Sequence, residues 1–103
     1  MIVVNARLTA TVGIIAAMTD AIIKMEKASR AEPGCDGYTW SVELGDPSTM
    51  LVTERWVDLQ ALKDHFVTPH MDEFQGIMGE HPTLGTHVHC YEVNEIPLPP
   101  MPS

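Results

Sequence analysis

The spacing of hydrophobic residues changes along this chain, and the order of the changes limits the folds that it can adopt. Residues 2–9 are rich in β-branched side chains and put an apolar residue at every second position, which predicts a strand. Residues 12–30 instead place apolar side chains three and four positions apart, which predicts an amphipathic helix with one buried stripe. Pro33 and Gly34 follow, and this pair is typical of a helix end.

The second half of the chain predicts a hairpin, two helical segments and a last strand. Residues 37–44 and 49–57 alternate, and the turn sequence "GDPST" joins them, so together they predict a hairpin. Asp58 can cap a helix over the residues that follow it, and Thr68-Pro69 interrupts that helix and can open the next. The sequence "THVHCYEV" predicts the last strand.

Together these elements have the order β-α-β-β-α-β, which is the split βαβ or ferredoxin-like arrangement of the α+β class. The predicted sheet is antiparallel and carries its helices on one face. With 103 residues the chain is long enough for one hydrophobic core, and we assign this domain to residues 1–95. Residues 96–103 are rich in proline and predict an extended tail.

The other face of the predicted sheet has no helix to cover it. We expect this face to carry a mixed and partly apolar set of side chains, namely Val3, Leu51, Thr53 and Val88. A monomer would expose that surface to water, and a second subunit is the simplest cover for it. The sequence therefore predicts a homodimer formed by packing one sheet on the other.

The charge balance excludes several classes of partner. The chain has 6 basic and 14 acidic residues and a net charge of -8, so it lacks the clustered basic residues that bind nucleic acid or anionic membranes. No segment has the pattern of a signal peptide or a membrane span, so we expect a cytoplasmic protein. Cys35 and Cys90 are too few to indicate a disulfide framework.

Four stretches carry a resemblance to a known family: "ARL", "ASRAEPGCDGY", "TERW" followed by Asp58, and "HFVTPHMDEF". In this order they resemble the antibiotic biosynthesis monooxygenases, also called small quinol monooxygenases. The resemblance implies a dimeric α+β barrel in which each subunit has a pocket between sheet and helices. It also implies oxidation of quinols or polycyclic phenols by molecular oxygen without a metal or organic cofactor. Ile14 and Ile15 depart from the family, which usually has charged residues there.

Three polar residues are candidates for catalysis. His70 follows Pro69, and a neutral imidazole there could accept the phenolic proton, although it could instead cap the helix junction. His65 is either a second polar group of the pocket or a surface histidine. Glu54 lies on an apolar strand face, where a carboxylate needs a partner. It could orient a histidine or bind a hydroxyl, or it could pair with an arginine such as Arg7 or Arg30.

Large apolar side chains are candidates for the substrate wall. Trp56 and Trp40 could stack on a flat aromatic ring, although strand tryptophans also serve as core. Phe66, Phe74 and Met50 would complete an adaptable apolar wall. The predicted substrate is therefore a small aromatic molecule.

Metal binding and two other functions are the alternatives to this prediction. His87 and His89 share a strand face in a spacing that suits a metal, but no third ligand stands nearby in sequence, and we expect no metal or cofactor. One alternative is an isomerase of the same fold that acts on a phosphorylated sugar-derived signal. The other is a ligand-binding or stress-response module without turnover.

Overall fold

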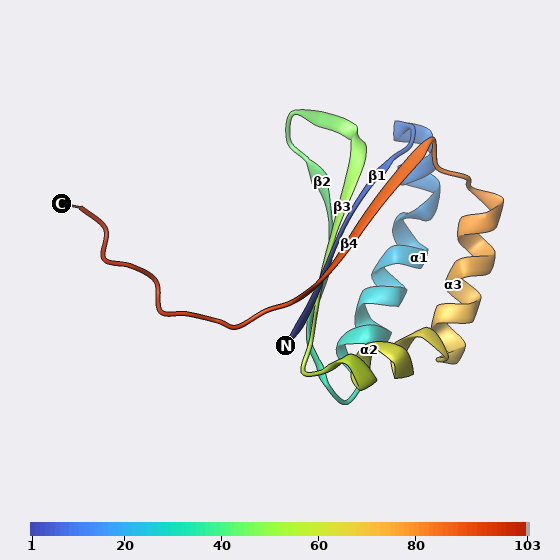
Figure 1. The fold of residues 1–103 in the computed structure, drawn as a ribbon. Helices are drawn as coiled ribbons and strands as arrows, with labels where there is room; N and C mark the ends of the chain where they lie inside the picture. The colour runs from blue at the N-terminus through green and yellow to red at the C-terminus, as the bar shows by residue number, and fades with distance from the viewer. Residues whose placement is uncertain (103) are drawn as a thin grey trace.

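The computed structural model describes residues 1–102, which form one sheet with helices on one side (Figure 1). In chain order the elements are β1 (Ile2–Thr9), α1 (Val12–Arg30), β2 (Cys35–Glu43), β3 (Asp46–Trp56), α2 (Leu59–Phe66), α3 (Pro69–Glu80) and β4 (Gly85–Glu92). This order confirms the predicted ferredoxin-like fold, with the second helical region divided into α2 and α3. Ser103, the last residue of the predicted tail, lies outside the described residues.

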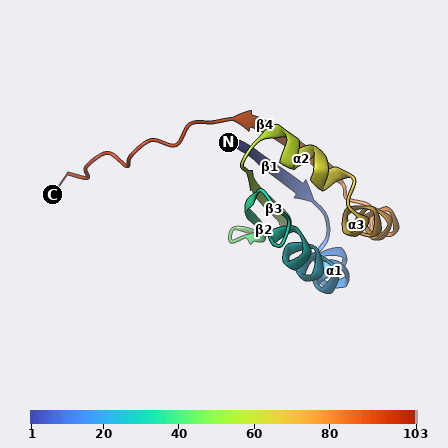
Figure 2. The ribbon, with the colours of Figure 1, turned by 90° about the horizontal axis from the view of Figure 1, so that it is seen from below.

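The sheet is antiparallel throughout and has the strand order β2-β3-β1-β4. The three helices cover one of its faces and leave the other bare (Figures 1 and 2). Val4 pairs with Glu54 on β3 and with Cys90 on β4, so these three side chains point to the helix side. Asn5 pairs with His89, and both belong to the bare face.

Capping side chains fix the starts of α2 and α3. The Ala61 backbone N–H donates to Oδ1 of Asp58 at 2.8 Å, and the Met71 N–H donates to Oγ1 of Thr68 at 3.2 Å. Each bond satisfies an N–H that the first helical turn cannot pair. Pro69 occupies the first turn of α3, where its missing N–H costs nothing. The Asp58 cap and the helix start at Pro69 agree with the sequence, and the structure adds Thr68 as the cap of α3.

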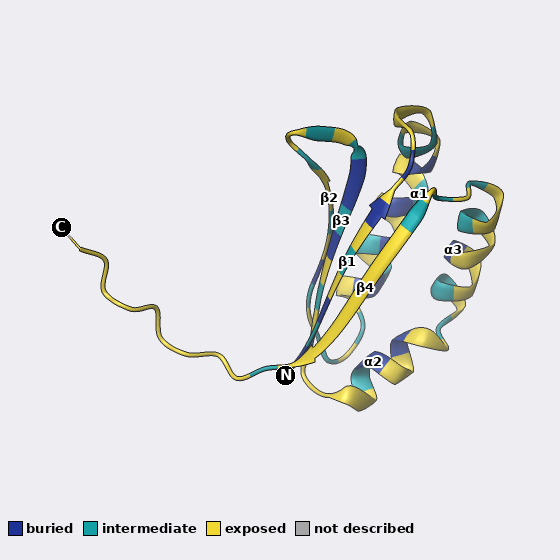
Figure 3. Ribbon diagram, turned by 45° about the horizontal axis from the view of Figure 1, so that its top comes forward, coloured by how far each residue is buried: buried dark blue, intermediate teal, exposed yellow. Residues whose placement is uncertain are grey.

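The core lies between the sheet and the helices (Figure 3). Its most deeply buried side chains include Trp56 of β3 and Met18 and Met25 of α1, none more than 2% exposed. The helix layer covers β1, β2 and β3 better than the edge strand β4. Val88 of β4 is 59% exposed although it points to the helix side.

Two expectations about the strands need correction. Val88 does not lie on the bare face, because its pairing with Ala6 turns it toward the helices. The β4 residues on the bare face are instead His87, His89 and Tyr91. The hairpin turn is also shorter than predicted, since β3 already begins at Asp46 and pairs there with Glu43. A one-residue change in strand register reverses every side chain, and the polar sequence of β4 gave no apolar alternation to set it.

Beyond β4 the chain leaves the body of the molecule. Residues 93–102 contain no helix or strand and extend away from the sheet (Figures 1 and 2). Ile96, Leu98 and Met101 are at least 73% exposed there. Within the described part of the chain, none of the helices is both long and apolar enough to span a bilayer.

Candidate functional site

The site is built around a carboxylate that β3 turns into the interior. Glu54 points toward the helices, and its side chain is 13% exposed. The indole Nε1 of Trp56, two residues along the same face, donates a hydrogen bond to its Oε1 at 3.1 Å. Burial raises the pKa of Glu54, while the bond from Trp56 and the proximity of His65 act in the opposite direction. The negative charge of Glu32 adds to the effect of burial, and the pKa of Glu54 lies above the ordinary value of a glutamate.

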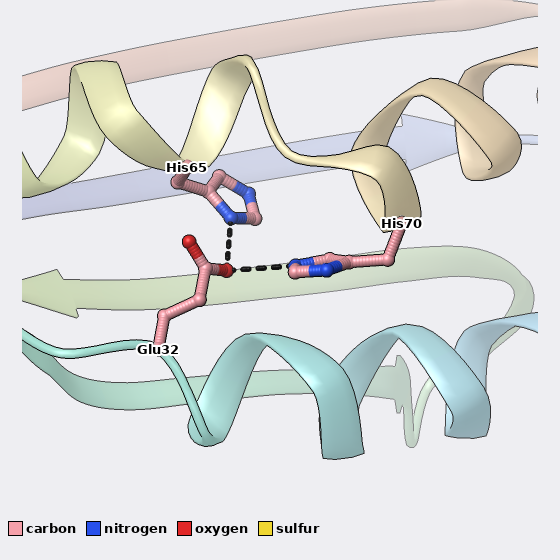
Figure 4. Close-up of side chains that lie close together, drawn as sticks. All are labelled: Glu32, His65 and His70. Carbon is pink, nitrogen blue, oxygen red and sulfur yellow. Dashed lines mark hydrogen bonds and ion pairs between the residues drawn. The ribbon is translucent and has the colours of Figure 1, made fainter.

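A second carboxylate, that of Glu32, contacts two histidines (Figure 4). Oε2 of Glu32 lies 2.7 Å from Nδ1 of His65 and 2.8 Å from Nε2 of His70. Glu32 follows α1, His65 stands near the end of α2, and His70 is the second residue of α3. The side chains therefore converge from three separate helix ends.

His65 links this cluster to the carboxylate of Glu54. Its Nε2 lies 4.0 Å from Oε1 of Glu54, while its Nδ1 contacts Glu32. The imidazole is 1% exposed and packs against the indole of Trp56, with ring centroids 4.6 Å apart. The Tyr38 ring centroid lies 5.7 Å away. Both ring nitrogens of His65 therefore face carboxylates, and aromatic side chains pack around the ring.

An apolar cavity of about 230 Å³ lies between the sheet and the helices. Trp40, Phe66 and Phe74 form part of its wall, and the Trp40 and Phe74 rings meet edge to face with centroids 5.5 Å apart. Glu54 is the carboxylate on its lining, which also includes Tyr38. Gln75 and Thr86 add polar groups, and no lysine or arginine among the described residues lines the cavity. This arrangement offers an apolar space with a single acidic group.

The family follows from comparison with known proteins. The family model of the antibiotic biosynthesis monooxygenases matches residues 1–76. The chain belongs to the antibiotic biosynthesis monooxygenase family. The match includes Glu54, Trp56 and the three residues of the Glu32 cluster, whereas Met78, Thr86 and Val88 of the cavity lining lie beyond it.

Solved structures share the fold of this family member. A protein from Deinococcus radiodurans, provisionally named an antibiotic biosynthesis monooxygenase, is 24% identical with a TM-score of 0.87, over 95% of this chain and 97% of that one. Rv0793 from Mycobacterium tuberculosis is 23% identical with a TM-score of 0.81, over 92% and 96%. At such identities the likeness establishes the fold alone. No curated protein sequence matches the chain.

The predicted site residues of this monooxygenase-family chain fall into three groups. Glu54 lines the cavity, as do the predicted wall residues Trp40, Phe66 and Phe74. Trp56 and His65 lie behind Glu54 rather than on the lining. His70 and Met50 do not line the cavity: His70 binds Glu32, and Met50 is buried in the core.

Two of the alternatives raised by the sequence are wrong. His65 is not a surface histidine, because it is 1% exposed. Glu54 does not pair with an arginine, because Arg7 binds Glu43 at 2.9 Å and Arg30 binds Glu26 at 3.3 Å. The partner of Glu54 is instead the indole N–H of Trp56.

Glu32 is the residue of this site that sequence reasoning missed. It belongs to "ASRAEPGCDGY", one of the stretches that resemble the family, and the sequence by itself assigns no role to it. The signal that could have revealed it is an acidic residue placed directly before the Pro33-Gly34 helix terminator. Glu32, His65 and His70 also offer one metal-ligating atom each, and the three atoms lie within 4.8 Å of one another.

Proposed function

We propose that this chain is a cofactor-independent monooxygenase that oxidises a quinol or a polyphenolic aromatic with molecular oxygen. The observation that carries the proposal is the carboxylate of Glu54 on the lining of an aromatic, otherwise largely apolar cavity. The volume of about 230 Å³ lies below the roughly 300–1,000 Å³ typical of sites for drug-sized ligands. A ring system of one or two fused rings fits that size.

In the proposed reaction Glu54 acts as the general base. It accepts the proton of a ring hydroxyl, and the resulting phenolate transfers one electron to O₂. Superoxide and the ring radical then combine at a ring C–H carbon, and Glu54 returns its proton to the new peroxide. The hydroperoxide loses water, so one oxygen atom stays on the ring as a carbonyl and the other leaves in the water. A dry cavity favours this sequence because it keeps bulk water from the reactive intermediates.

His65 and Glu32 support this role from behind. A carboxylate in an apolar cavity resists ionisation, and a nearby imidazole that can carry positive charge favours the ionised form. Glu32 fixes the His65 ring through Nδ1, so Nε2 stays directed at Glu54. We therefore assign Glu54 as the base and His65, Glu32 and His70 as positioning residues.

The cavity chemistry favours this proposal over the isomerase of a phosphorylated substrate. A phosphate group needs donors of positive charge, above all arginine or lysine. Among the described residues none of either type lines the cavity, whereas aromatic side chains line much of it. Neutral aromatic substrates suit this lining better than anionic ones.

We further propose that the enzyme works as a homodimer in the cytoplasm. The support for the dimer is the bare sheet face, which carries Val3 and Leu51 together with polar neighbours (Figure 2). Covering that face with the same face of a second copy would bury both without exposing a new apolar surface. Cys35 and Cys90 are unpaired, which suits a reducing compartment.

Oxygen consumption with a panel of reduced naphthoquinones and polyphenols tests the proposal. We expect chelator-treated protein to consume one O₂ per product and to insert one ¹⁸O atom from labelled O₂. Glu54→Gln should slow this reaction by about a hundredfold or more, the usual contribution of a general base. Glu73→Gln is the matched control, because Glu73 pairs with Lys24 on the surface and is 54% exposed. Equal rates for the two variants, or no oxygen uptake with any substrate, would contradict the proposal.

A further inference from the structure

We propose that Glu32, His65 and His70 form a binding site for a divalent transition-metal ion such as Zn²⁺ or Co²⁺. None of the three residues lines the apolar cavity, so the site is separate from the one proposed for the aromatic substrate. The inference goes beyond the proposed function and does not depend on it, because metal binding can be measured without turnover.

The positions of the three ligand atoms favour an ion. Oε2 of Glu32 lies 2.7 Å from Nδ1 of His65 and 2.8 Å from Nε2 of His70, and all three atoms lie within 4.8 Å of one another. Around a tetrahedral ion with bonds of about 2.0–2.2 Å, neighbouring ligand atoms stand roughly 3.3–3.6 Å apart. The carboxylate and the two rings would therefore have to separate by roughly 0.5–0.9 Å to admit an ion between them (Figure 4).

The surroundings of His65 supply a second, independent feature of metal sites. A histidine that ligates through one ring nitrogen usually directs the other toward a carboxylate or carbonyl, which fixes its tautomer. Nδ1 of His65 faces Glu32, and Nε2 faces Oε1 of Glu54 at 4.0 Å. With an ion on Nδ1, the proton of His65 would reside on Nε2 and point at Glu54.

An acidic groove on the surface reaches Glu32, one of the three residues of the cluster. The groove measures about 300 Å³ and is lined by Glu32, Asp58 and Asp64 together with apolar and backbone groups. The chain carries a net charge of -8, which attracts cations to such a surface. His70 is 22% exposed in its side chain, so the cluster is not sealed from solvent. An ion could therefore enter without opening the core.

The ligand types select the class of ion. Two imidazoles and one carboxylate suit zinc, cobalt and nickel, whereas Mg²⁺ and Ca²⁺ prefer oxygen ligands. Three protein ligands leave at least one position for water or another small ligand. The three residues come from the ends of α1, α2 and α3, so an ion bound there would tie three helix ends together. Preferential binding to the folded state would also raise the melting temperature.

Titration of chelator-treated protein with Co²⁺ tests this site directly. We expect a visible cobalt absorption that saturates at one ion per chain and is displaced by one equivalent of Zn²⁺. Glu32→Gln and His70→Ala should each weaken binding by about a hundredfold or more, beyond the roughly 10–100-fold that changes to outer partners produce. Circular dichroism verifies that both variants fold. Because His70 is only half-buried, its alanine variant should disturb the fold less than the Glu32 variant.

A matched control uses the other histidine pair of the chain. His87 and His89 share the bare face of β4, away from the cluster, so His87→Ala/His89→Ala should bind Co²⁺ as tightly as the wild type. The proposal is overturned if wild-type protein shows no saturable absorption, or if binding survives Glu32→Gln and His70→Ala. Loss of binding in the β4 double variant would overturn it as well, since the ion would then lie on the sheet face.

Discussion

Trp56 donates its indole N–H to Glu54 across 3.1 Å, and both side chains point from β3 toward the helices. The bond places a donor next to a carboxylate that burial would otherwise drive toward its neutral form. Trp56 is 1% exposed, so it acts from the core rather than from the cavity wall. A residue expected to stack on the substrate thus serves the proposed base instead.

Trp56→Phe should move the acid limb of the pH–rate profile to higher pH. Glu54 works as a base only when ionised, so activity is lost as pH falls through its pKa, which burial has raised. Removing the indole donor weakens support for the charged form and raises that pKa further. We expect the acid limb of the kcat/KM profile to move by about one pH unit, because this is the size of pKa change that the loss of a hydrogen bond to a charged group produces.

Trp40→Phe is the control for that shift. The Trp40 indole donates to the Tyr38 hydroxyl at 3.1 Å and not to Glu54. Its substitution can alter KM through the cavity wall, but it should leave the acid limb in place. An acid limb that moves equally in both variants, or in neither, would disprove the role of the Trp56 hydrogen bond.

Phe66→Ala should raise KM by about tenfold with little change in kcat. Phe66 lines the cavity yet is 55% exposed, so its removal takes apolar contact from the substrate more than from the core. Loss of part of one aromatic contact should cost about 1–2 kcal/mol of substrate-binding free energy. Val67→Ala, one residue on and 83% exposed, is the control and should leave KM unchanged. Similar KM values in the two variants would remove Phe66 from the substrate wall.

His70→Ala decides between the two candidate bases. His70 binds Glu32 and does not line the cavity, so its loss should keep steady-state oxidation within about tenfold of the wild type. Loss of the base itself would cost about a hundredfold or more. A hundredfold fall in kcat for a folded His70→Ala variant would therefore return the role of base to His70.

Leu51→Arg should convert the protein from a dimer to a monomer. Leu51 of β3 pairs with Arg7 of β1, and both residues lie on the bare face of the sheet. In a sheet-on-sheet dimer, an arginine at position 51 would bury a charge without a partner. Light scattering should give twice 11.4 kDa for the wild type and 11.4 kDa for the variant. Val67→Arg, on the helix side, should stay dimeric. A monomeric wild type, or a dimeric Leu51→Arg variant, would refute the interface.

The sequence predicted the fold where local physical rules apply. The alternation in β1 and β3 identified their buried faces, since side chains of a strand alternate regardless of what packs on them. Asp58 and Pro69 located the starts of α2 and α3 because capping is a short-range interaction. Glu54 was recognised as unusual because a carboxylate on an apolar face stands out even without coordinates.

The rest depended on contacts between distant parts of the chain. Glu32 meets His65 and His70 at sequence separations of 33 and 38 residues, and no local pattern indicates such a meeting. The burial of His65 could be predicted only from the way in which α2 lies on the sheet. The side of β4 that Val88 occupies depended on register, which an exposed edge strand without apolar alternation does not specify.

Proton transfer from a phenolic substrate in the apolar cavity to Glu54 can be observed in the absence of oxygen. An anaerobic absorption difference spectrum compares a quinol bound to wild-type protein with the same quinol bound to Glu54→Gln, at a pH where the free quinol is neutral. We expect the red-shifted spectrum of the ionised phenolate with wild-type protein and the spectrum of the neutral quinol with the variant. A neutral spectrum with both proteins at saturating quinol, or a phenolate spectrum with both, would contradict proton transfer to Glu54.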